Sequence, residues 1–106
     1  MNQTGTGIDI FPAGSPPGLQ PHGVIIDAAF IQGNMGGLVV IKLRAGELEV
    51  HNHEQQHVGV VLEGSFELVL DQGAIPVHAG EIYRIASNVP HGVRCQDQAL
   101  IVQARA

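Results

Sequence analysis

The sequence predicts an all-β domain, folded as a sandwich or barrel, on the basis of three observations. Short runs rich in aliphatic and β-branched residues alternate with turn signals from Gly23 onward, as in VIIDAAFI followed by QGNMGG. No window shows the 3.6-residue period of an amphipathic helix. Hydrophobic residues make up 44% of the 106 residues and charged ones only 14%, which indicates a compact core instead of a disordered chain.

The chain divides into a Pro/Gly-rich N-terminal arm at residues 1–21 and a single β-domain at 22–106. The arm contains GTG and FPAGSPPGLQP, and these residues break helices and favour extended or turn backbone. Within the domain, Glu63-Gly64 and Asp71-Gln72-Gly73 predict hairpin turns, because glycine supplies the positive φ that such turns need.

Charge and cysteine content exclude several classes of partner. The net charge is −5 and only five residues are Lys or Arg, so the chain cannot neutralise a run of phosphates on a nucleic acid or an anionic membrane. Cys95 is the only cysteine, which excludes an intrachain disulfide and fits a reducing compartment. The N-terminus lacks the features of a signal peptide, and the apolar runs are too short to span a bilayer. We expect a cytoplasmic protein with a small-molecule ligand.

The segment HNHEQQH at 51–57 concentrates three of the six histidines in seven residues. Alternate residues of a strand face the same side, so His51 and His53 point together. The tripeptide EQQ would then turn the chain, so that His57 opens an antiparallel partner strand. Imidazoles gathered in this way suit a first-row transition metal and not Mg²⁺ or Ca²⁺, which prefer oxygen ligands. The alternative interpretation is a polar hairpin whose histidines are solvated.

These residues resemble the cupin family over about residues 22–104. The first cupin signature matches at Gly46, His51, His53, His57 and Gly64. The second matches GEIYRIASNVPHGV at 80–93, with His91 at the histidine that completes the metal site. The resemblance implies a cupin double-stranded β-helix, that is, a jelly-roll barrel, with a metal held by His51, His53, His57 and His91.

One departure from the signature affects the expected chemistry. His57 stands where most cupins have glutamate, so the site resembles the four-histidine subset, some of which are similar to manganese cupins with oxidative activity. Four neutral imidazoles leave a divalent ion with its full charge, which disfavours a higher oxidation state and favours Lewis-acid chemistry. We expect a divalent transition metal with Mn preferred, while Fe, Zn, Ni and Cu stay open because nitrogen sites follow the general affinity order.

The sequence leaves three functions open, and an enzyme is favoured over a binding protein. The first is an O₂-dependent, dioxygenase-like oxidation of a small aromatic or enolisable substrate. The second is a non-redox isomerase, cyclase or lyase that uses the metal as a Lewis acid. The third is a non-catalytic, metal-dependent ligand-binding module. No catalytic residue is identified, and Glu54 and Cys95 are secondary candidates because of their places beside the predicted ligands.

We also expect a homodimer. Apolar strand faces such as VIIDAAFI and ALIVQA exceed what one short barrel covers, and the arm needs a surface to lie on. Twofold dimers are the commonest oligomers, and the resemblance to cupins implies the same.

Overall fold

A computed structural model of the chain describes residues 7–51 and 54–105. Over these residues all regular structure is β, and no helix is present that is long and apolar enough to cross a membrane. The all-β prediction is therefore confirmed. The strands are β1 (Gln20–Pro21), β2 (Ile26–Gly33), β3 (Gly36–His51), β4 (His57–Leu70), β5 (Gly73–His78), β6 (Ile82–Ile85) and β7 (His91–Arg105).

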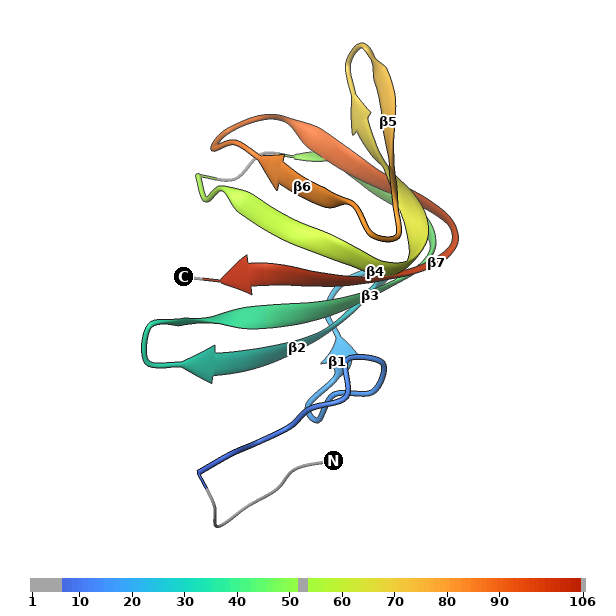
Figure 1. Cartoon of the computed structure of the whole chain (residues 1–106). Coiled ribbons are helices and arrows are strands. Elements are labelled where there is room, and N and C mark those ends of the chain that lie inside the picture. Colours follow the sequence, from blue (N-terminus) through green and yellow to red (C-terminus); the bar gives the residue numbers. More distant parts are fainter. Residues whose placement is uncertain (1–6, 52–53, 106) are drawn as a thin grey trace.

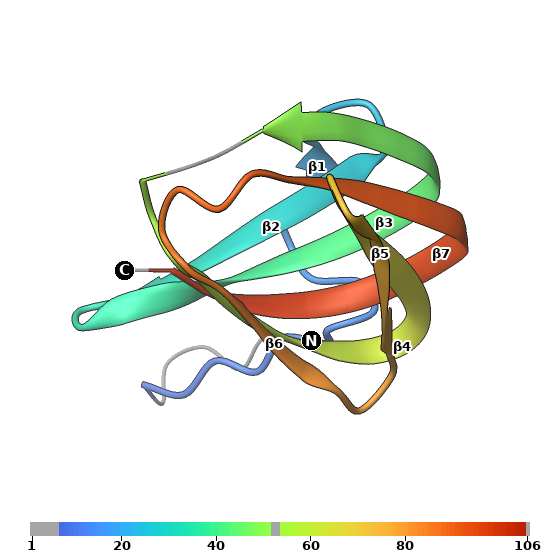
Figure 2. The same ribbon diagram turned by 90° about the horizontal axis from the view of Figure 1, so that it is seen from above.

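All strand pairs are antiparallel, in the order β1-β2-β3-β7-β4-β5, and β6 pairs separately with β4. The last strand of the chain, β7, therefore lies between β3 and β4, as Figure 1 shows. The start of β4 pairs with β6 and the end of β4 pairs with β5, so β4 passes through two halves of the barrel, one that contains β6 and one that contains β5. The strands β3 and β7 are also long enough to take part in both halves. The curvature of these strands, seen from above in Figure 2, wraps the sheet around an interior.

The predicted hairpin at Glu63-Gly64 is wrong, because β4 continues through both residues. Gly64 does adopt the expected positive φ of 74°, but it does so at a bend where the register of β4 against β7 shifts. A shift of this kind is a β-bulge, which bends a strand without ending it. The turn after Leu70 is confirmed: Asp71 and Gln72 connect β4 to β5, and Leu70 pairs with Gly73.

The hydrophobic core lies inside the curve of the long strands. Most of its members come from the inward faces of β3, β4 and β7, and Val61 is fully buried. The alternation of buried and exposed residues along β4 explains this, since Gly59 and Val61 are buried whereas Val58 and Leu62 are exposed. The rest of the interior, beyond this core, forms a pocket.

Candidate metal-binding pocket

Three of the four predicted metal ligands meet at one end of the barrel. His51 ends β3 and His91 begins β7, and the two are paired residues on neighbouring strands. Their ring centroids lie 4.7 Å apart, and the ring of His57, at the start of β4, lies 5.9 Å from that of His91. No group of three metal-ligating side chains forms among residues 7–51 and 54–105. The fourth predicted ligand, His53, lies outside the described residues.

The predicted hairpin between the first and third histidines is wrong. Strands β3 and β4 do not pair with each other, because each pairs with β7. His51 pairs with His91 in one half of the barrel, whereas His57 pairs with Ile85 of β6 in the other. The histidine segment therefore joins the two halves of the barrel, and the ring of His91 lies within 6 Å of both other rings because the halves curve toward each other.

Backbone carbonyls orient two of the imidazoles. The Nδ1 of His51 lies 2.8 Å from the carbonyl oxygen of Glu49, and the Nδ1 of His91 lies 2.9 Å from that of Val89. A carbonyl only accepts hydrogen bonds, so each Nδ1 carries a proton, and in the neutral form of either ring the lone pair is on Nε2. Metal-ligating histidines are oriented by the same kind of bond. The tautomers of His51 and His91 therefore fit ligation of a divalent transition metal through Nε2.

The imidazoles open into a cavity of about 720 Å³. Its walls are mostly apolar and include Phe30, Phe66, Leu68, Val93 and Ile101. None of the ten acidic residues, all of which lie in the described part of the chain, belongs to its wall. The cavity is of the size and polarity that small-molecule sites have.

Comparison with known proteins identifies the family. The model of the cupin domain family matches residues 37–103, which include β4, β5, β6 and nearly all of β3 and β7. The chain belongs to the cupin family. A search of curated proteins finds no match to this cupin.

Solved structures share its fold. An RmlC-like cupin from Shewanella frigidimarina has a TM-score of 0.70 and 23% sequence identity, with 83% of each chain covered. KdgF from Halomonas has a TM-score of 0.67 and 20% identity, covering 83% of this chain and 86% of its own. The polyketide cyclase RemF from Streptomyces resistomycificus has a TM-score of 0.69 and 26% identity, covering 81% of this chain and 68% of its own.

The cupin pocket also holds a tyrosine that sequence analysis did not single out. Tyr83 of β6 lies over Gly59 of β4, where a Cβ would come within 2.6 Å of its hydroxyl oxygen. Glycine at this position lets the phenol reach across β4 and donate a hydrogen bond of 2.6 Å to Oε1 of Gln103 on β7. Burial raises the pKa of the Tyr83 phenol above its ordinary value, so it stays neutral at physiological pH.

The pocket wall also contains polar residues that the motifs do not include, among them Gln103 and Arg105. Both lie near the end of β7, where alternation places them on the same face as the buried Ile101. That alternation is a signal present in the sequence, but it becomes informative only once Ile101 is known to face the interior.

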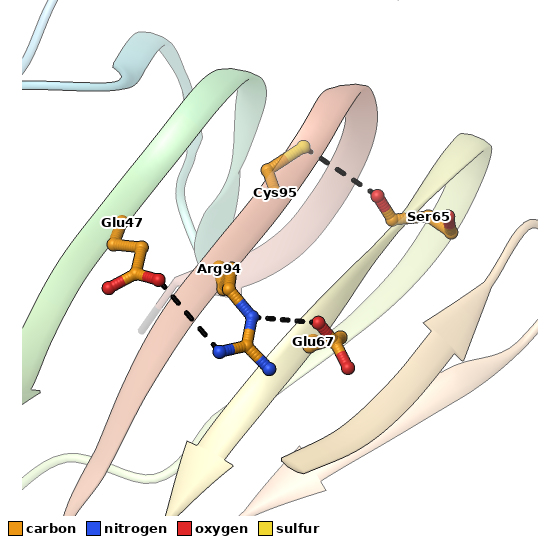
Figure 3. A network of polar contacts seen from close by, with 5 residues as sticks. All are labelled: Glu47, Ser65, Glu67, Arg94 and Cys95. Carbon is orange, nitrogen blue, oxygen red and sulfur yellow. Dashed lines mark hydrogen bonds and ion pairs between the residues drawn. The ribbon is translucent and has the colours of Figure 1, made fainter.

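Neither of the two secondary catalytic candidates, Glu54 and Cys95, belongs to the described wall of the pocket. Cys95 is 3% exposed within the core, where its Sγ lies 3.6 Å from the carbonyl oxygen of Ser65 (Figure 3). Glu54 is exposed beyond the end of β3. A catalytic role for either residue stays a prediction. The neighbour of Cys95, Arg94, forms ion pairs with Glu67 at 2.8 Å and Glu47 at 3.8 Å, also drawn in Figure 3.

Proposed function

We propose that the chain is a metal-dependent cupin enzyme whose ion is held by His51, His53, His57 and His91. The observation that carries the proposal is that the rings of His51 and His57 both lie within 6 Å of the ring of His91. In His51 and His91 a backbone carbonyl accepts from Nδ1, which directs Nε2 to act as the ligand. His91 is 4% exposed, and an imidazole fixed in this way loses little freedom on binding an ion.

The reaction class that the pocket supports best is a non-redox isomerisation, cyclisation or elimination of a small enolisable substrate. A bound divalent ion would supply Lewis-acid chemistry at a substrate oxygen. The apolar wall excludes water from the substrate. Tyr83, neutral and held by Gln103, offers a phenol oxygen that can hydrogen-bond to substrate or carry a proton. The 26% identity with a polyketide cyclase favours the same class.

An O₂-dependent, dioxygenase-like oxidation is the second candidate. It is favoured by the aromatic and aliphatic wall around the imidazoles, which suits an aromatic substrate and an apolar gas. Against it stands the absence of a carboxylate from the proposed ligand set, because a carboxylate would stabilise a higher oxidation state. Manganese is the ion we expect for either reaction.

Elemental analysis of the protein purified without a histidine tag tests the site. We expect about one equivalent of a divalent transition metal in the wild-type protein and in the His78→Ala variant. His78 is exposed and contacts Glu81 outside the pocket, so its variant is a matched control. The His91→Ala variant should lose most of the metal, since removing one well-placed ligand weakens binding at least about tenfold. Full metal content in His91→Ala would refute the site.

Turnover of a panel of phenols, diketones and polyketide-like substrates separates the reaction classes. Product formed equally well under argon and in air supports the non-redox reaction. Product formed with matching uptake of O₂ supports the oxidation and overturns our preferred class. Binding of these compounds without any turnover of the metal-loaded protein would instead indicate a non-catalytic ligand-binding module and contradict the proposal of an enzyme.

A further inference from the structure

The described wall of the pocket contains a single arginine. Arg105, near the end of β7, lines the same cavity as the three imidazoles. Its guanidinium carbon lies 4.5 Å from the centroid of the Phe30 ring. The opposite strand position is occupied by Gly37, which has no side chain to contact it. Within residues 7–51 and 54–105, no carboxylate forms an ion pair with Arg105.

Other arginines of the chain are used differently. Arg44 forms an ion pair with Asp27, and Arg94 forms ion pairs with Glu67 and Glu47. Those guanidinium groups neutralise carboxylates and join neighbouring strands. The guanidinium of Arg105 is instead stacked on an aromatic ring, an arrangement that fixes its plane and leaves its N–H edge able to bind a ligand.

The charge distribution around the cavity has the opposite sign to that of the whole chain. The protein has a net charge of −5, yet the described cavity wall contains Arg105 as its one charged side chain and none of the ten acidic residues. A cavity with low-dielectric walls and one sign of charge concentrates ligands of the opposite sign. A small anion is therefore attracted to this pocket in spite of the acidic surface.

The Phe30 ring beneath the Arg105 guanidinium extends the apolar wall of the cavity as far as Arg105. Phe30 is 47% exposed and belongs to the cavity wall, and the edge of the His22 ring packs against it with centroids 5.6 Å apart. A ligand that contacts both Phe30 and Arg105 needs an apolar, planar body and a planar anionic group. Arginine binds carboxylates through two parallel hydrogen bonds, so a carboxylate matches this arrangement best.

We propose that Arg105, stacked on Phe30, is the subsite that binds the carboxylate of a small planar carboxylic acid, while the body of the ligand lies along the apolar wall toward the imidazoles. This proposal rests on the proposed function, because it names the substrate class of the same pocket. It assigns Arg105 to binding and not to the reacting atoms.

Calorimetric titration with 1-naphthoate and with the uncharged 1-naphthamide tests the subsite. In the wild-type protein we expect naphthoate to bind about tenfold more tightly or better, since hydrogen bonds to charged groups are the strong ones. The Arg105→Gln variant should lose this preference and bind both probes about equally. The Arg94→Gln variant removes the same charge outside the cavity and should keep the preference. Equal binding of naphthoate by Arg105→Gln and wild type would overturn the proposal.

Repeating the titrations after removal of metal with a chelator separates this proposal from the proposed function. If the preference for naphthoate survives chelation and is lost only in Arg105→Gln, the subsite is supported whether or not the metal site exists. If chelation abolishes the preference and Arg105→Gln does not, the anion binds at the metal, and the subsite is wrong while the metal site stands. No difference between the probes in any state would also refute the subsite.

Discussion

The thiol of Cys95 shows how burial controls the chemistry of one residue. It is 3% exposed in a cluster with Val61, Phe66 and Ala99, and its weakly donating thiol lies 3.6 Å from the carbonyl oxygen of Ser65. Burial raises the pKa of the Cys95 thiol, because the thiolate would lose its hydration in the core. The side chain therefore acts as a small apolar group, as most buried cysteines do.

We predict that Cys95 resists alkylation in the folded protein. Iodoacetamide at pH 8 should modify it at least about tenfold more slowly than in the guanidinium-unfolded chain, followed by mass spectrometry, because only the exposed thiolate reacts. The folded protein keeps the Cys95 thiol proton to a higher pH than the unfolded chain does. The free energy of unfolding is therefore unaffected by this thiol below its ordinary pKa of about 8.5 and decreases as pH rises above that value. This fall should be smaller in Cys95→Ala. Equal alkylation rates in both states would contradict the burial of the thiol.

At the scale of elements, the long strands bend where the sequence suggests that strands end. The segments RAGE and EG, together with QDQ between two apolar runs, look like turns, yet each lies inside β3, β4 or β7. Register shifts of β7 against its two neighbours fall at these places, and a further shift against β3 lies between Leu48 and His51. Bulges at adjacent positions on paired strands bend the sheet as a unit, so that three strands pass from one half of the barrel to the other.

We predict that Gly64→Ala is strongly destabilising because Gly64 forms this bend. Its φ of 74° is disfavoured for alanine, and a Cβ there would overlap the carbonyl oxygen of Gln98 on β7. We expect a loss of about 3 kcal/mol in chemical unfolding, about 1 from the backbone and about 2 from the steric clash. The control is Gly80→Ala, where φ is 87° but a Cβ meets no atom within 4 Å. A similar loss in both variants would show that the contact with β7 is unimportant.

At the scale of the whole molecule, one outer face of the barrel is apolar. Val58 of β4 is 38% exposed, Ile82 of β6 is 75% exposed and Leu38 of β3 is 46% exposed. Pairing of β6 with β4 and of β3 and β4 with β7 brings these strands into one continuous surface. A contiguous apolar face on a small domain is typical of an interface.

We predict a homodimer that buries this face, with a mass by light scattering of about 22 kDa, twice the 11.2 kDa of one chain. Ile82→Glu should shift the mass toward that of the monomer without unfolding the protein, because a charge is costly only when the face is covered. Met35→Glu places the same charge at a fully exposed turn away from the strands and should leave the dimer intact. A wild-type mass of 11 kDa at high concentration would refute the dimer.

The sequence by itself determined the fold class and the family. Apolar runs without helical period are sufficient to predict strands, because the alternation of side chains is a local property of extended backbone. The spacing of His51, His53 and His57 and the position of His91 pointed to the cupin family, which the match over residues 37–103 confirms. The turn at Asp71-Gln72 was also predictable, since its chemistry is local.

Only the tertiary structure decided what the ends of the long strands contact. A glycine such as Gly64 allows a positive φ in a hairpin or in a bulge alike, and pairing with β7 selects the bulge. Likewise, His57 faces His91 because β7 inserts between β3 and β4, which no local pattern reveals. Arg105 lines the same pocket because β7, the last strand of the chain, lies between β3 and β4 at the centre of the sheet. Strand order depends on long-range burial and pairing, and so it is settled by the folded chain as a whole.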